Sequence, residues 1–253
     1  MRVNGIILNT FREAIRDKIF ITIIIFAVIV MGSSKVVQPL ALGQEEKVIK
    51  DIGLNSITLF TVLIAVLVGG RLVYKEIEKR TIYLIISRPI HRWQFIIGKY
   101  FGLLLVIFES LLIMACVFYL ILVLLGITPS LNLLLSILMT FFELWIITAL
   151  AIFFSTFSSP ITSSIFTFAI YFLGHLTRDF RAFAIATKSP STKVIADILY
   201  YLLPNLANFN IKAEVVHNIY LEPKIFILTI AYTVLYSTIV LIFSCLLFQK
   251  KDF

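Results

Sequence analysis

The chain has 253 residues, of which 60% are hydrophobic and 14% are charged. Soluble domains carry about 25% charged residues, so this composition excludes a soluble globular protein and indicates a polytopic membrane protein. The net charge of +8 lies mostly beside apolar segments, where it is typical of membrane orientation and of contact with anionic lipid, not of nucleic-acid binding. Cys116 and Cys245 fall inside apolar runs and are expected to be buried thiols, not a disulfide.

The N-terminal segment, residues 1–18, predicts an amphipathic helix at the membrane surface. Val3, Ile7 and Phe11 fall on one helical face, and Arg12 and Arg16 fall on the other. A cleavable signal peptide is the alternative, but the apolar run that follows continues without a small-residue cleavage site.

Six apolar runs predict transmembrane helices and therefore an all-α fold in a single transmembrane domain covering residues 1–253. The expected spans are residues 19–34, 54–73, 95–126, 131–154, 161–176 and 225–248. Small residues in two of them, the pairs Gly69-Gly70 and Gly98/Gly102, predict close helix packing.

Two polar segments separate these spans at the predicted outer side. Residues 35–53 are expected to be a mixed-charge loop with a short helix. Residues 177–224 are expected to form an extracytoplasmic loop that lies along the membrane surface and contains an amphipathic helix at 192–203.

The distribution of Lys and Arg predicts the orientation. Seven basic residues lie around the segment between the second and third spans, against three in the loop before the second span. Basic residues are enriched on the cytosolic side, so we expect a multi-pass protein of the cytoplasmic (inner) membrane with both termini in the cytosol.

The segment 75–94 is charged and basic but contains the apolar run 82–86. Thr81 can cap a short helix over that run, and Pro89 ends it, because the residue before a proline disfavours helical geometry. An amphipathic helix of this length indicates a docking element at the membrane surface.

The order of residues in this segment resembles a known family. Glu76-x-Glu78-x-x-Thr81 is followed by an apolar run, by Ser-Arg-Pro at 87–89, by Arg92 and by Phe-Ile-Ile-Gly-Lys at 95–99. This order resembles the cytosolic segment between spans two and three of permeases of type 2 ABC exporters, particularly the branch that includes multicopper-enzyme maturation permeases. Residues 9–20 and 202–210 resemble that family too, whereas Arg80 stands where many members have Gly.

In that family the segment forms the coupling helix that contacts the ATPase subunit. The resemblance therefore implies that one set of residues transmits ATP-driven motion: Glu76, Glu78, Arg80, Thr81, Leu84, Ile85, Ser87, Arg88, Pro89 and Arg92. It also implies an ABC ATPase in two copies and a second permease chain, as a homodimer or a heterodimer. The lipid bilayer is the remaining expected partner, and no nucleic acid is expected.

The sequence contains no pattern that would let the chain hydrolyse ATP itself. Gly98-Lys99 lacks both the upstream glycine and the following hydroxyl of a phosphate-binding loop. His91, His175 and His217 lie in separate segments and are expected at the surface or the membrane interface, not as metal ligands. We therefore expect no enzyme activity, no metal and no cofactor.

Two acidic residues, Glu109 and Glu143, are predicted near the middle of the bilayer. Each lies about twelve residues into its helix, and the rise is about 1.5 Å per residue, so the two lie at similar depths. A carboxyl group there is expected to be hydrogen-bonded, and Ser110, Thr140 and Thr148 are the candidate partners. The pair could join helices, or it could belong to a translocation path or a subunit interface.

The function expected from these observations is the permease subunit of an ABC exporter. An ion-coupled secondary transporter is one alternative, although the sequence lacks the internal repeats and Gly- or Pro-broken spans typical of that class. A membrane-embedded enzyme that uses Glu109 and Glu143 is the other alternative. No Cys, His and Met cluster indicates copper as the substrate.

Overall fold

The computed structural model describes residues 2–37, 43–78, 91–187, 190–217, 219 and 223–249. These residues form helices joined by turns, and no strand occurs among them, which confirms the all-α prediction. In lipid a helix satisfies its own backbone hydrogen bonds, so long apolar runs fold in this way.

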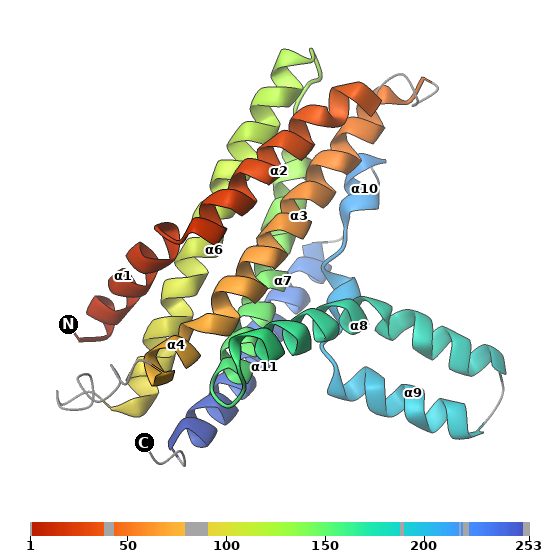
Figure 1. The fold of residues 1–253 in the computed structure, drawn as a ribbon. Helices are drawn as coiled ribbons and strands as arrows, with labels where there is room; N and C mark the ends of the chain where they lie inside the picture. Colours follow the sequence, from red (N-terminus) through yellow and green to blue (C-terminus); the bar gives the residue numbers. More distant parts are fainter. Residues whose placement is uncertain are drawn as a thin grey trace.

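Four long helices form the body of the molecule and run side by side (Figure 1). They are α2 (Lys18–Val37), α3 (Glu45–Leu72), α6 (Arg92–Leu124) and α7 (Leu131–Ser155). A fifth long helix, α11 (Pro223–Gln249), packs against α7 and α6. Helix α6 ends at Gly126, where a φ of 72° allows the Ile127 N–H to donate to the Leu122 carbonyl and stop the helix.

The helices α3 and α7 form the centre of the bundle, and two glycines let their neighbours approach closely. A Cβ atom at Gly69 would lie 2.9 Å from the Ala151 Cβ atom. A Cβ atom at Gly70 would lie 2.7 Å from the Ser164 hydroxyl oxygen. The packing predicted for this pair is therefore confirmed.

Four helical stretches of the described chain are long and apolar enough to cross a bilayer. They are residues 45–76, which run from the beginning of α3 into α4, and the helices α6, α7 and α11. The apolar helix at residues 18–34, within α2, is shorter. These helices indicate a multi-pass membrane protein, and the expected number of six spans stays a prediction. Helix α3 begins at Glu45, so the short helix expected within residues 35–53 is present and continues without a break into the second expected span.

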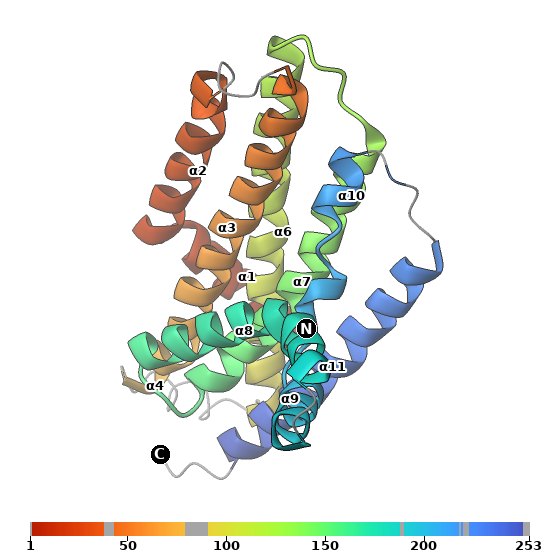
Figure 2. The same cartoon turned by 90° about the vertical axis from the view of Figure 1, so that its right-hand side faces the viewer.

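Helix α8 (Pro160–Thr187) contains the fifth expected span but continues well beyond residue 176. It runs across the long helices and projects from the bundle, and α9 (Pro190–Leu202) folds back beside it (Figures 1 and 2). Arg181 joins the two helices, because its Nε atom lies 3.8 Å from Asp197 and its guanidinium lies 4.6 Å from the Tyr200 ring centre. The amphipathic helix predicted at 192–203 corresponds to α9.

The segment after α9 turns into the bundle. It contains the short helix η2 (Leu206–Asn208) and α10 (Lys212–Val216), and its apolar side chains belong to the same buried cluster as those of α3 and α7. Leu206 is fully buried, and a Cβ atom at Gly174 of α8 would lie 2.8 Å from the Pro204 carbonyl oxygen. We call residues 203–216, whose apolar side chains pack between helices, the inserted segment. Their expected position along the membrane surface stays a prediction.

Helix α1 (Arg2–Ile15) lies along the first part of α6. A Cβ atom at Gly98 would lie 2.7 Å from the Ile6 side chain, and one at Gly102 would lie 2.6 Å from the Thr10 side chain. The small pair in the third expected span therefore serves helix packing, as predicted. Helix α1, the short helix α4 (Tyr74–Glu78), the first turn of α6 and the last turn of α11 meet at one end of the bundle, which we call the charged end (Figure 1).

This close contact predicts that a large side chain at Gly102 separates α1 from α6. Gly102→Leu should destabilise the protein by about 1–3 kcal/mol, the usual effect of overpacking. Thermal unfolding in detergent micelles measures the change. The control is Gly32→Leu, where the added side chain meets no atom within 4 Å, and equal melting temperatures for the two variants would contradict the packing.

Candidate functional site

The predicted coupling residues fall partly within the described chain. Glu76 and Glu78 lie in α4, and Arg92 is the first residue of α6. The other residues of the predicted set lie outside the described residues: Arg80, Thr81, Leu84, Ile85, Ser87, Arg88 and Pro89. The structure therefore describes the two ends of the coupling segment.

Lys99 of α6 lies at the centre of the charged end, and its side chain is only 2% exposed. Its ammonium nitrogen lies 3.0 Å from the Glu76 Oε1 atom and 3.8 Å from the Glu13 Oε2 atom. The same nitrogen lies 5.7 Å from the centre of the Phe95 ring. Burying a lysine without partners is costly, so these two carboxylates offset the cost of placing Lys99 there.

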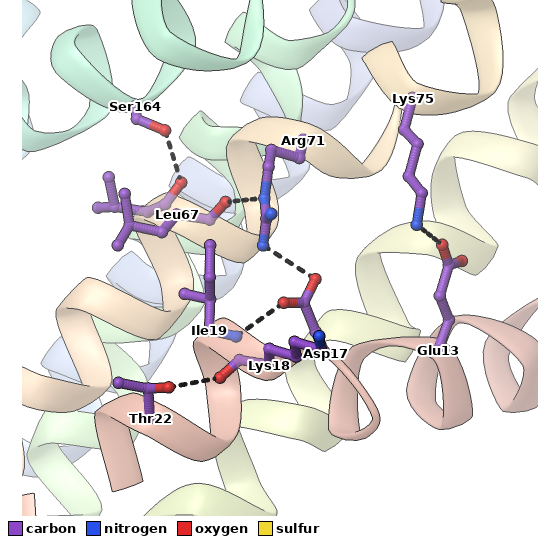
Figure 3. Close-up of polar contacts among 10 residues, drawn as sticks. Glu13, Asp17, Lys18, Ile19, Thr22, Leu67, Arg71, Lys75 and Ser164 are labelled. Carbon is purple, nitrogen blue, oxygen red and sulfur yellow. Dashed lines mark hydrogen bonds and ion pairs between the residues drawn. The ribbon is translucent and has the colours of Figure 1, made fainter. Parts of the chain in front are cut away.

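A second set of ion pairs continues from Glu13 towards α3 (Figure 3). Glu13 also pairs with Lys75, and the Arg71 guanidinium donates to the Asp17 Oδ2 atom at 3.0 Å. Arg71 donates in addition to the Leu67 carbonyl oxygen, and the other Asp17 oxygen accepts the Ile19 N–H at 2.9 Å. Asp17 therefore connects the beginning of α2 to the last turn of α3.

Arg92 lies against the end of α11. Its Nη1 atom donates to the Gln249 carbonyl oxygen at 2.8 Å and approaches the Phe248 carbonyl oxygen at 3.4 Å. The rings of Phe95 and Phe248 stack with centres 5.7 Å apart. The last carbonyls of a helix have no partner within it and carry partial negative charge, so an arginine is a favourable partner for them. Glu76 and Arg92, for which the family resemblance implies a contact with an ATPase, make contacts within the chain.

Glu143 of α7 is 1% exposed and bonds to His175 of α8. The distance between the His175 Nε2 and Glu143 Oε1 atoms is 2.7 Å, and the edge of the Tyr171 ring lies against the imidazole. Sequence reasoning missed this pair, because His175 was expected at the surface or interface. The pair depends on how α8 crosses α7, and no local sequence pattern indicates that crossing.

The partners predicted for the interior acids are engaged elsewhere. Each of their hydroxyl groups donates to a carbonyl oxygen of its own helix: Ser110 to Ile107, Thr140 to Ser136 and Thr148 to Leu144. Among the described residues, the Glu109 Oε2 atom is buried and has no hydrogen-bond partner. The two acids therefore have different surroundings, although their predicted depths are similar.

The inserted segment brings a lysine towards Glu143. Lys212 begins α10, and its ammonium nitrogen lies 3.3 Å from the Asn55 side-chain oxygen of α3. Burial lowers the pKa of Lys212 below its usual value, while the Glu143 and Asp51 carboxylates partly offset this effect. Lys212 thus connects α10 to an exposed side chain of α3 and is affected electrostatically by Glu143 of α7.

Over the described ranges, no three His, Cys, Asp or Glu side chains gather closely enough to hold a metal ion. The other two histidines, His91 and His217, are exposed. Both Lys99 and Glu143 instead find their partners within the described part of the bundle.

The Glu143–His175 pair leads to a stability prediction. Removing one partner leaves the buried Glu143 carboxyl group without this hydrogen bond, which costs about 1–3 kcal/mol. His175→Phe should therefore lower the stability by this amount in denaturant unfolding in micelles. The exposed His217 provides the matched control as His217→Phe, and a His175→Phe protein as stable as that control would contradict the role assigned to the pair.

The comparison with protein families agrees with this arrangement. A family model described as ABC-2 family transporter protein matches residues 5–253, which covers all but the first three residues of α1 and all of the later helices. No curated protein matches the chain. The matched region includes both the coupling segment and the charged end that holds its two ends. The chain belongs to the ABC-2 transporter family and is a multi-pass membrane permease.

Proposed function

We propose that this chain is the transmembrane subunit of an ABC exporter and couples ATP hydrolysis on a separate ATPase subunit to the translocation of a substrate. One observation carries the proposal. The two ends of the coupling segment are held together by the Glu76–Lys99 ion pair and are connected to α1 and α11 by Glu13 and Arg92. A force applied to that segment would therefore reach several helices.

The coupling segment has the composition of a docking surface. Its apolar run, residues 82–86, is too short to span a membrane and needs a partner to cover it. Charged residues flank the run on both sides, so the contact has an apolar centre and a polar rim, as protein interfaces commonly do. The proposed contacts of this rim and centre are Glu76, Glu78, Arg80, Thr81, Leu84, Ile85, Ser87, Arg88, Pro89 and Arg92.

The proposed orientation places the charged end in the cytosol of a cell with a cytoplasmic (inner) membrane. Basic residues concentrate at this end, which supports the assignment through the positive-inside rule. Both termini then lie in the cytosol. The inserted segment 203–216 then runs from beside α8 and α9 towards the opposite, extracytoplasmic end, the direction in which α10 lies (Figures 1 and 2).

Glu143 is proposed to lie at an interface that moves during transport. It bonds to α8 across the bundle and lies near Lys212 of the inserted segment, so a change in the position of either element changes its surroundings. Glu109, whose buried oxygen has no bonding partner in the described chain, is proposed to face the translocation path or a second subunit.

The docking role predicts that a charge in the apolar run removes the ATPase. In Leu84→Asp, a desolvated carboxylate without a partner would cost several kcal/mol, so the cognate ABC ATPase should no longer co-purify. Arg88→Ala should weaken its capture more mildly. The control is Leu202→Asp in α9, where the leucine is already 70% exposed. Capture by Leu84→Asp at wild-type strength would refute the docking role.

The stoichiometry gives a separate test. ABC transporters work with two ATPase domains, and one coupling segment per chain requires two permease chains. Mass measurement of the complex in lipid nanodiscs should give two permeases with two ATPases. A single permease chain that still stimulates ATP hydrolysis would contradict this assembly, and substrate transport without any ATPase would favour a secondary transporter.

A further inference from the structure

Lys99 contacts two elements that precede it in the chain and approach it separately. Glu13 comes from α1 and Glu76 comes from α4, while Lys99 itself belongs to α6. Glu13 is shared, because its other carboxylate oxygen pairs with Lys75, the neighbour of Glu76. Two acids and two bases thus alternate in one compact set, which we call the Lys99 network: Glu13, Lys75, Glu76 and Lys99.

The Glu76–Lys99 pair closes the chain across the coupling segment. The two residues are 23 positions apart, and everything between α4 and the beginning of α6 lies inside the loop that they close. The Lys99 side chain is 2% exposed and that of Glu76 is 17% exposed, so water screens the pair weakly. The two ends of the segment therefore remain at a fixed separation when the segment is pushed.

Helix α1 is fixed to the same end of α6 by packing. The side chains of Ile6 and Thr10 in α1 lie so close to Gly98 and Gly102 that a Cβ atom at either glycine would overlap them. Lys99 is the next residue after Gly98. Close packing between small residues allows little sliding, because any shift brings side chains into overlap. Helices α1 and α6 are thus coupled both by packing and by charge, and α4 is joined to them by ion pairs.

A purely stabilising role would not require charges at this position. Buried ion pairs contribute little net stability compared with apolar side chains of the same shape. They do provide contacts to particular partners at fixed distances, which a layer of apolar side chains does not. This difference separates a transmitting role from simple adhesion between helices.

We propose that the Lys99 network transmits the displacement of the coupling segment to α1 and α6, and that Lys99 is a positioning residue for ATP-driven transport. The inference rests on the proposed function, because it requires an ATPase at the segment. The Asp17–Arg71 pair extends the path, since it links the α1–α2 junction to the last turn of α3 (Figure 3). Motion received beside Glu76 therefore reaches α2 and α3 as well.

The test separates ATPase capture from ATPase stimulation. Complexes of the permease with its co-purifying ABC ATPase are assembled in nanodiscs for the wild type, Lys99→Met, Glu76→Gln and the double variant. Both substitutions keep the approximate shape and remove one charge. We expect Lys99→Met, which lies outside the proposed docking contacts, to keep capture at wild-type strength and the KM for ATP unchanged. Permease-stimulated turnover per captured complex should fall about tenfold in each single variant.

The double variant shows whether the two residues act as one unit. If they do, turnover in the double variant should be no lower than in the less active single variant, because either substitution alone already removes the Glu76–Lys99 ion pair. The control is Lys224→Met, which removes an exposed lysine at the opposite end of α11 and should leave turnover within about twofold of the wild type.

Several results would overturn the inference. If the variants stimulate ATP turnover per captured complex as strongly as the wild type, the network is only a structural contact. This holds even if their melting temperatures are lower. Losses that multiply in the double variant would show that the two residues act independently. Loss of capture in both single variants would make them docking residues. If the wild-type chain captures no ATPase, the proposed function itself fails, and the inference fails with it.

Discussion

Charged groups buried in an apolar bundle must find partners inside it, and this constraint organises both ends of the described interior. At one end Lys99 is enclosed by α1, α4 and α6 and is neutralised by Glu13 and Glu76. Farther along, Glu143 of α7 forms a hydrogen bond with His175, which joins α7 to α8 where the two helices cross. In each case a polar contact joins elements whose apolar surfaces alone would allow several registers.

The sequence predicted the long helices well, because apolar runs in lipid have few alternatives to helix. The limits of α7 and α11 lie within two residues of the expected spans. Local polarity misled the interpretation elsewhere. The charged residues at 45–51 indicated a loop with a separate short helix but form the first turns of α3. The Pro-Asn turn at Pro204 gave no sign that the residues after it pack into the bundle. In both places packing against neighbouring helices outweighed the local pattern.

The candidate site was predictable only in part. Family resemblance directed attention to Glu76 and Arg92, and the structure places both at the charged end, but their partners Lys99 and the α11 carbonyls could not be read from spacing. Glu143 was singled out correctly as a costly group that needed a partner. The identity of that partner depends on the crossing of α7 and α8, which is a tertiary property without a local signature.

The inserted segment also has a consequence for the order in which the molecule assembles. Its packing surfaces on α3, α7 and α8 all precede it in the chain, so they are already available while it is being synthesised. One of its backbone donors, the Asn205 N–H, bonds to the Tyr232 hydroxyl of α11 at 3.0 Å. Insertion of α11 therefore adds the last helix that contacts this segment. Until α11 is in place, the Asn205 N–H lacks this hydrogen bond.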